Sequence, residues 1–192
     1  MAKLGFYFDM RACIGCRACQ IACNDKNRIE NAGILYREVQ TFEAGKYPNA
    51  GMFHLSMSCN HCENPACVDK CPTGAMYIAE DSTVQHNDAI CIGCQACVSA
   101  CPYGHPKYFE NMQLVGKCDS CRSLREAGKK PACVDACIMR CLDFGPLDEL
   151  IQKYGSDLVT EMHCMPESNT NPAFLVKAKS FGLMEDPKKK DL

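Results

Sequence analysis

The sequence lacks any long apolar run and has no excess of charge of either sign. Nowhere do roughly eighteen apolar residues follow one another, so we expect no segment that spans a bilayer. Lys and Arg number 21 against 23 Asp and Glu, and the one basic run, residues 188–190, lies in a polar tail. We therefore expect no nucleic-acid partner. Residues 1–10 contain neither an apolar core nor a small-residue cleavage site, so no signal peptide is expected.

Cysteine, in contrast, is abundant, with 18 among the 192 residues. A chain of this length suits one compact domain or two small ones with a modest core. Cysteine at this density is typical of small folds that are held together by disulfides or by metal. Cysteine chemistry must therefore decide the fold.

Sixteen of the cysteines form four groups of four along the sequence. The groups are Cys13, Cys16, Cys19 and Cys23; Cys59, Cys62, Cys67 and Cys71; Cys91, Cys94, Cys97 and Cys101; and Cys118, Cys121, Cys133 and Cys137. The first and third have the spacing C-x2-C-x2-C-x3-C, and Pro102 follows the third, as in bacterial ferredoxins that bind 4Fe-4S clusters. The second and fourth groups keep the outer gaps and lengthen the middle one.

Such spacing suits a cube of iron and sulfide. Three thiolates on one tight turn bind different irons of the same cube only if the backbone wraps around it. Gly15 and Gly93, which precede the second cysteine of their groups, permit the positive φ that this path needs. The cysteine after the x3 gap reaches the other cluster of a two-cluster unit. The four groups therefore predict two mated pairs and four 4Fe-4S clusters.

Two other uses of cysteine fit the pattern less well. Structural zinc sites also use C-x2-C pairs, but they do not call for a third and fourth cysteine at x2 and x3 with a following proline. A disulfide scaffold is disfavoured because no export signal is expected and cysteines separated by two intervening residues on one turn are poorly placed to pair.

The pattern around the cysteines predicts an α+β fold made of two nested ferredoxin-like units with small sheets and short helices. A strand over 52–57 and a hairpin of 76–78 with 83–85 belong to an inner unit of about 50–108. An outer unit, 1–49 with 109–145, contains a strand over 4–8 and a helix over 122–127. Residues 146–192 add a helix over 146–154 and an extended arm, for which a partner subunit offers a surface.

The cysteine segments resemble the iron-sulfur B subunit of the dimethyl sulfoxide reductase family of molybdopterin oxidoreductases, over roughly residues 5–155. The matching segments are CIGCRACQIAC, SCNHCENPACVDKCPTGAM, CIGCQACVSACPYG and KCDSCRSLREAGKKPACVDAC, followed by DFGPLDEL. The resemblance implies a non-catalytic subunit that relays electrons between a quinol-oxidising membrane anchor and a molybdopterin-containing catalytic subunit. It also implies a peripheral place on the cytoplasmic membrane, on the outer face through co-export with the catalytic partner, with a cytoplasmic complex as the alternative.

The resemblance further implies which cysteines share a cluster. We name each set of four by its first member. The Cys13 set is Cys13, Cys16, Cys19 and Cys137; the Cys23 set is Cys23, Cys118, Cys121 and Cys133; the Cys59 set is Cys59, Cys62, Cys67 and Cys101; the Cys71 set is Cys71, Cys91, Cys94 and Cys97. By the same resemblance the first two sets face the molybdenum subunit, and the Cys71 set faces the quinol side.

Three residues near the ligand positions are expected not to bind iron. Cys141 and Cys164 stand outside the four groups and are expected to act as small apolar residues. His61, between two expected ligands, is expected to support the site without binding metal. The sequence also departs from the family where Ile138, instead of proline, follows Cys137.

Two other functions stay open at this stage. A free-standing soluble polyferredoxin differs from a complex subunit because it does not co-purify with a large molybdenum protein. A zinc-stabilised interaction module would be colourless, whereas an iron-sulfur protein is brown. The substrate of a catalytic partner, the direction of electron flow and the presence of a membrane anchor are not encoded in these residues.

Overall fold

The computed structural model describes residues 2–190 and shows a mixed α+β fold of small sheets and short helices. The strands are β1 (Leu4–Asp9), β2 (Arg37–Ala44), β3 (Gly51–Ser58), β4 (Met76–Ile78), β5 (Val84–His86), β6 (Lys107–Phe109), β7 (Leu114–Gly116), β8 (Leu142–Pro146), β9 (Phe174–Lys177) and β10 (Lys188–Lys190). The helices are α1 (Ala18–Asn27), α2 (Ala66–Asp69), α3 (Ala96–Ala100), α4 (Arg122–Glu126), α5 (Ala132–Asp135) and α6 (Leu147–Tyr154), with 3-10 turns η1 (Asp88–Ile90) and η2 (Ser180–Leu183).

The strand expected over 4–8 is confirmed as β1, the central strand of a three-stranded sheet. It pairs with β8 in antiparallel fashion and with β9 in parallel fashion. Phe6 and Phe8 point into the largest core cluster, while Tyr7 packs with the residues of α6 on the other face. Because both faces of β1 are buried, its residues are apolar without a break from Phe6 to Phe8.

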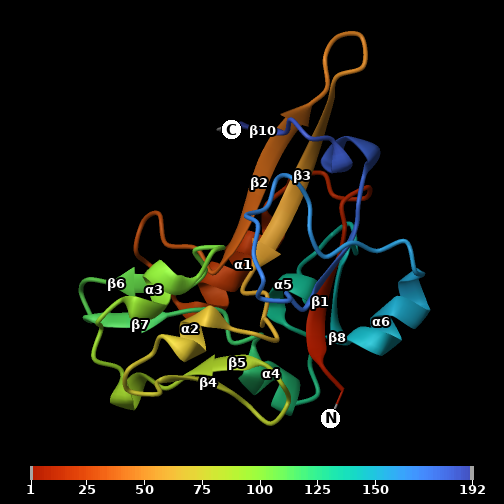
Figure 1. Ribbon diagram of the computed structural model, residues 1–192. Coiled ribbons are helices and arrows are strands. Elements are labelled where there is room, and N and C mark those ends of the chain that lie inside the picture. Colours follow the sequence, from red (N-terminus) through yellow and green to blue (C-terminus); the bar gives the residue numbers. More distant parts are fainter. Residues whose placement is uncertain (1, 191–192) are drawn as a thin grey trace.

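The second sheet is a long hairpin of β2 and β3 with β10 along the far edge of β2. Figure 1 shows this hairpin extending well beyond the rest of the molecule. The strand expected over 52–57 is confirmed as β3, but its partner β2 was not predicted. The Phe42 and Phe53 rings stack across the hairpin with their centroids 5.3 Å apart.

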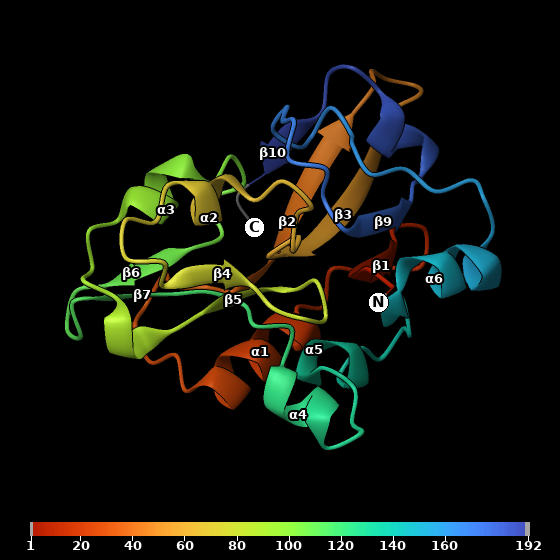
Figure 2. The same ribbon diagram turned by 60° about the horizontal axis from the view of Figure 1, so that its bottom comes forward.

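The remaining sheets are two short hairpins, β4 with β5 and β6 with β7. The first is the hairpin expected from residues 76–85, with its second strand one residue further along. Figure 2 shows both hairpins, α2 and α3 gathered on one side of the molecule, with α1, α4 and α5 together below them. The two-unit division that the sequence suggests remains a prediction.

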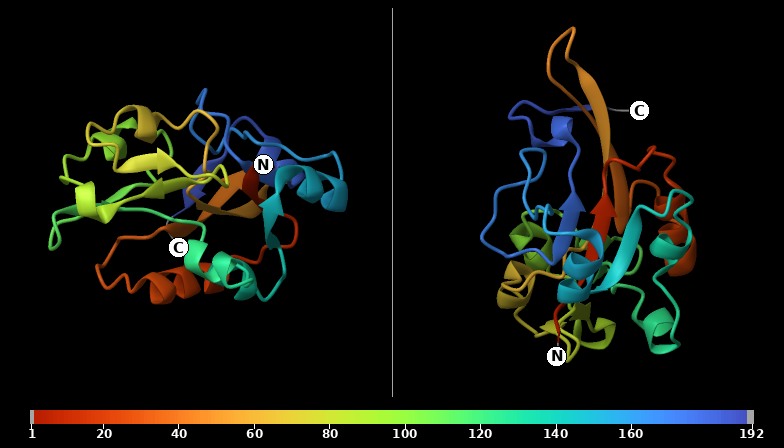
Figure 3. Two further views of the ribbon diagram at one scale, coloured as in Figure 1. Left: turned by 90° about the horizontal axis from the view of Figure 1, so that it is seen from below. Right: turned by 90° about the vertical axis from the view of Figure 1, so that its right-hand side faces the viewer.

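The segment after α6, expected to be an extended arm on a partner subunit, contributes two strands to sheets of the same molecule. Contact of this segment with a partner stays a prediction. β9 adds to the sheet beside β1, and β10 adds to the hairpin beside β2. The right-hand view of Figure 3 shows β9, in blue, next to β1, in red. Phe174, Leu175 and Val176 are all buried, so the strand has no polar face and shows no alternation that would reveal it in the sequence.

The helix expected over 146–154 is confirmed as α6, and it packs as ordinary core. Leu150 is buried against Tyr7 and Leu175, while Ile151 of the expected apolar stripe is exposed. The rings of Tyr154 and Tyr7 stack with centroids 3.6 Å apart. The helix expected over 122–127 is likewise present as α4, followed by Gly128 at φ 71. No helix among residues 2–190 has the length and apolar character needed to cross a membrane.

Candidate iron-sulfur cluster sites

The first and third cysteine groups adopt the same backbone turn. Gly15 and Gly93 have φ values of 70 and 65, and the residues after the second cysteines, Arg17 and Gln95, are left-handed at φ 60 and 61. A short helix then begins, α1 in the first group and α3 in the third. A Cβ on Gly93 would overlap the carbonyl oxygen of Gln113, so this turn requires glycine for space as well as for φ.

The second and fourth groups share a different turn. Each places its third cysteine in a one-turn helix of sequence Ala-Cys-Val-Asp, which is α2 in one case and α5 in the other. A proline, Pro65 or Pro131, precedes each helix at its N-terminus and presets the entry of the backbone. The longer middle gap is thus absorbed before the helix, and the x3 spacing that follows keeps the same geometry in both groups.

Three of the four expected sets come together as electrostatic neighbours. Cys23 interacts with Cys118, Cys121 and Cys133, and burial together with these neighbours raises its pKa. The Cys59 set meets around Cys67, whose pKa rises to about 12 through burial and then the charge of Cys59. The Cys71 set meets around Cys97, whose pKa rises to about 11, first through burial and then through the charges of its neighbours.

The fourth expected set lines one cavity. Cys13, Cys16, Cys19 and Cys137 share it with Cys141, Val39 and Ser56. The segments that supply these residues are the first turn, β2, β3 and the end of the fourth group, so the set joins parts that are far apart in the sequence. The structure thus brings each expected set together, and the assignment of these thiols as ligands is a proposal.

The donors fit a 4Fe-4S cluster in chemistry as well as in grouping. Burial raises the pKa of Cys62 to about 11, so a thiolate there needs a cation to replace its proton, and iron supplies one. Backbone N–H groups donate to the sulfurs, from Met76 to Cys71 and from Ser120 to Cys118, each at 3.4 Å. Such hydrogen bonds are typical of cluster ligands and tune their potential.

Among residues 2–190, no three His, Cys, Asp or Glu side chains gather closely enough to hold one metal ion. A tetrahedral zinc site holds its sulfurs about 2.3 Å from one metal, whereas a cube holds each on a separate iron.

Exposure distinguishes two of the sixteen expected ligands from the others. Cys16 of the Cys13 set and Cys94 of the Cys71 set are exposed, whereas the other fourteen are buried or half-buried. The Cys23 and Cys59 sets contain no exposed member. Two sets therefore have one cysteine exposed at the surface, and two sets have none.

Cys141 lies among the expected ligands of the Cys13 set. Its sulfur is 3.4 Å from that of Cys137, and a hydrogen bond from Cys141 is the main cause that lowers the pKa of Cys13 to about 7. Cys164 packs separately against the core and is half-buried. His61 is fully buried, and its Nδ1 accepts a hydrogen bond from the Val84 backbone at 3.1 Å.

Two buried cations near the cysteines were missed in the sequence. Arg37 and Lys117 are 0% and 6% exposed, and both interact with Cys118. Arg37 does leave a trace, because it falls in register with Val39 and Thr41 on the inward face of β2. A charged residue at an inward position of a strand is a signal that reasoning from cysteine spacing passes over.

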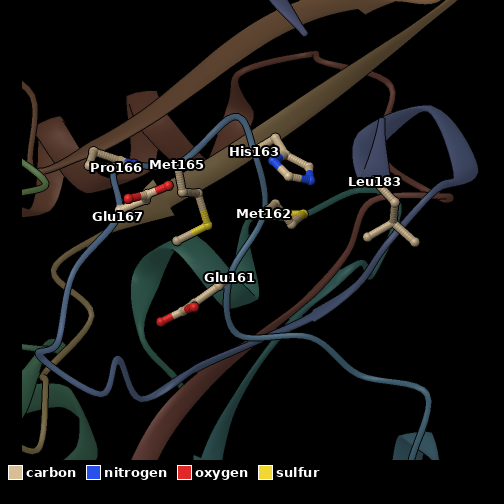
Figure 4. Close-up of a pocket in the computed structure, with 7 residues that line it drawn as sticks. All are labelled: Glu161, Met162, His163, Met165, Pro166, Glu167 and Leu183. Carbon is tan, nitrogen blue, oxygen red and sulfur yellow. The ribbon is translucent and has the colours of Figure 1, made fainter. Parts of the chain in front are cut away.

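A hollow of about 290 Å³ lies away from these sites beside the C-terminal segment, and no expected ligand lines it. Figure 4 shows the Glu161 and Glu167 carboxylates and the His163 ring pointing in different directions. These side chains do not converge on a common point, so the hollow is not a metal centre.

Comparisons with known proteins agree with the cysteine chemistry. A family model described as a 4Fe-4S dicluster domain matches residues 50–147, and one described as a 4Fe-4S binding domain matches residues 11–27. The B subunit of anaerobic dimethyl sulfoxide reductase from Haemophilus influenzae is 40% identical over 190 residues, which cover 94% of this protein and 92% of the relative.

Two further relatives extend the comparison. The protein of the same name from Escherichia coli is 40% identical over 91% of this protein and 88% of its own length. Protein NrfC from Escherichia coli is 38% identical over 77% of this protein and 67% of its own length. With these identities over most of its length, the protein belongs to the family of 4Fe-4S electron-transfer subunits that includes the B subunit of anaerobic dimethyl sulfoxide reductase.

Proposed function

We propose that this protein is a four-cluster relay that carries electrons between a quinol-oxidising membrane subunit, or another donor, and a molybdopterin catalytic subunit of the dimethyl sulfoxide reductase type. The observation that carries the proposal is the exposure of Cys16 and Cys94, whereas the other expected ligands are buried or half-buried. A relay needs one cluster near each partner and the rest shielded from solvent between them.

The contacts between cysteine sets support a linear order. The Cys71 and Cys59 sets are joined by α2 and α3, which pack together. Cys59 interacts with Cys118, which links the Cys59 set to the Cys23 set. Cys19 interacts with Cys133, which links the Cys23 set to the Cys13 set. Electrons would thus pass through the four sets in this sequence, with Cys94 at one end and Cys16 at the other.

Each end also carries exposed apolar side chains that suit docking. Ile14 and Met139 line the same cavity as Cys16 and are 55% and 43% exposed. Ile90 and Ile92, on either side of Cys91, are 47% and 66% exposed. A partner that covers these side chains would exclude water from the nearest cluster. By family resemblance the Cys16 end faces the molybdenum subunit and the Cys94 end faces the membrane subunit.

The proposed partners determine the proposed location in the cell. We place the protein at the cytoplasmic membrane as a peripheral subunit, on the outer face through export with the catalytic partner, and a cytoplasmic complex is the alternative. A soluble polyferredoxin is the second candidate function, and the family membership favours a complex subunit over it.

Co-purification tests the proposal. A tagged protein produced in its native host under anaerobic conditions is expected to retain a large molybdenum-containing protein, and the complex is expected to oxidise a quinol analogue. A matched variant, Ile14→Glu, places a charge in the docking surface around Cys16 and is expected to release the molybdenum protein while retaining its own iron. A brown protein that retains no molybdenum at any ionic strength would favour the polyferredoxin, and a colourless zinc protein would contradict both.

A further inference from the structure

Arg37 is a fully buried arginine at the start of β2, opposite Ser58 on β3. Its side chain enters the region where the Cys13 set and the Cys23 set meet. Burying a guanidinium is costly unless neighbouring groups compensate the charge. The groups around Arg37 therefore indicate which charges compensate its guanidinium.

The guanidinium is held rigidly on three sides. Nη1 donates to the backbone oxygen and to Oγ of Ser56, both at 3.2 Å, and Nη2 donates to Oγ of Ser58 at 2.8 Å. The guanidinium carbon lies 4.6 Å from the centroid of the Phe6 ring. All of these partners are neutral, so they fix the position of the charge without balancing it.

The same guanidinium reaches one cysteine from each neighbouring set. Ser56 Oγ, which accepts from Arg37, lies 3.3 Å from the sulfur of Cys19 in the Cys13 set. The charge of Arg37 also acts directly on Cys133 of the Cys23 set. Arg37 thus stands between two expected cluster sites and interacts with both.

The charge of Arg37 has no carboxylate partner within residues 2–190. No Asp or Glu in that range forms an ion pair with it, and the strongest interactions of its charge are with Cys133, Cys19, Cys118 and Cys23. Its Nε is buried and has no hydrogen-bond acceptor. Neutral thiols cannot balance an arginine, whereas a cube held by four thiolates carries a net negative charge that grows on reduction.

We infer that Arg37 is the shared counter-charge of the clusters in the Cys13 and Cys23 sets, and that it makes both reduction potentials less negative by favouring the reduced form of each. Its unpartnered Nε is the donor available to a sulfide or thiolate of the bound cluster. This inference rests on the proposed four-cluster relay. Arg37 would act through its positive charge, which lowers the energy of an added electron on the two clusters nearest the Cys16 end.

Lys117 provides a matched control because it is a second buried cation that also acts on the Cys23 set. It donates to the backbone oxygens of Val84 and Cys118, and its charge acts on Cys118 and Cys67. Its loss should therefore affect the Cys23 and Cys59 sets and spare the Cys13 set.

The test is a redox titration of the purified complex, followed by electron paramagnetic resonance, with iron content measured on every sample. In Arg37→Gln, two of four potentials are expected to become more negative by a tenfold or larger change in the reduction equilibrium, about 59 mV for a one-electron couple. Arg37→Lys should keep both reduction potentials close to their wild-type values. Lys117→Met should shift the potentials of the clusters in the Cys23 and Cys59 sets, of which only the Cys23 cluster is also affected by Arg37. Phe6→Leu, which loosens the packing and keeps the charge, should leave the potentials near wild type.

Unchanged potentials in an iron-replete Arg37→Gln complex would overturn the inference, as would an equal shift of all four or an equal shift in Arg37→Lys. If Arg37→Gln fails to take up iron, Arg37→Met decides, because it keeps an unbranched side chain and removes the charge. That variant is expected to move the same two potentials to more negative values, and unchanged potentials in an iron-replete sample overturn the inference. A wild-type protein with fewer than four clusters would instead contradict the proposed function.

Discussion

The sulfur of Cys141 lies 3.4 Å from the sulfur of Cys137, although only Cys137 belongs to the x3 spacing of its group. Both side chains are buried beside the expected site. Cys137 follows α5 by the same number of residues as Cys71 follows α2, which supports the proposal that Cys137 is the ligand.

We therefore predict that Cys141→Ser retains all four clusters and that Cys137→Ser loses one. Cys141 donates a hydrogen bond to a neighbouring thiolate in this arrangement, and serine can still donate one. Iron content and the electron paramagnetic resonance spectrum of the reduced protein check the result. Cys164→Ser is the control for cysteine removal away from the cluster sites. Loss of a cluster from the Cys141 variant alone would reverse the ligand assignment.

The four cysteine sets predict a definite metal content. Four cubes of four irons require about 16 iron and about 16 acid-labile sulfide per protein molecule. An anaerobic iron and sulfide assay of the fully loaded protein measures both. A value near eight would mean that only one mated pair of clusters is built.

Removal of iron is expected to unfold the protein. Fourteen of the expected ligands are buried or half-buried, and clusters in these places stand in for part of a small core. Circular dichroism of the protein after anaerobic treatment with a chelator should show loss of the cooperative thermal transition, with re-addition of iron and sulfide as the control. A cooperative melt in the iron-free protein would contradict this expectation.

Cys94 is predicted to mark the end of the relay that accepts electrons from quinol. Replacing it with Ser removes one ligand of the Cys71 set, and the cluster should become a 3Fe-4S cluster with a less negative potential that traps electrons. Quinol-driven turnover should fall steeply, whereas activity with a dye that reduces the catalytic subunit directly should persist. The 3Fe-4S resonance of the oxidised variant and the two activities are measured together. Equal loss of both activities would place Cys94 elsewhere in the relay.

Alanine variants of Gly93 and Gly74 distinguish the effect of steric overlap from the effect of backbone strain at the Cys71 set. Both have positive φ, at 65 and 70, so alanine costs about 1 kcal/mol or more at either position through backbone strain. Only at Gly93 would the added Cβ also meet backbone, namely the carbonyl of Gln113. Iron release on mild heating should therefore be faster for Gly93→Ala than for Gly74→Ala. Equal rates of iron release would show that the backbone at Gly93 shifts to accept the added Cβ.

Short-range patterns revealed more of this fold than long-range pairing did. The helix of residues 147–154 and the hairpin of residues 76–86 could be predicted because proline, glycine and alternation mark them locally. β2 was missed because its inward face carries Arg37 and Thr41, polar residues that hide the period-two pattern. β9 was missed because a strand buried on both faces has no polar period to detect.

The candidate site likewise has features that local sequence patterns predict and features that only the fold shows. Cysteine spacing predicted which thiols belong to each group, because covalent distance along the sequence limits what one turn can wrap around. It could not show the two exposed thiols, Cys16 and Cys94, since exposure depends on how distant segments cover each turn. Arg37 reaches Cys133 only through the folded sheet, so no local pattern connects them.

The position of β1 between β8 and β9 also has a consequence for biosynthesis. β1 leaves the ribosome well before the strands on either side of it, residues 142–146 and 174–177. The Cys59 and Cys71 sets are complete once residue 101 has emerged, whereas the Cys13 set needs residue 137. Domains fold as units during synthesis, and long-range closure is slow. We therefore expect iron loading to follow an order, in which the Cys59 and Cys71 sets can be filled while the N-terminal thiols still await Cys137.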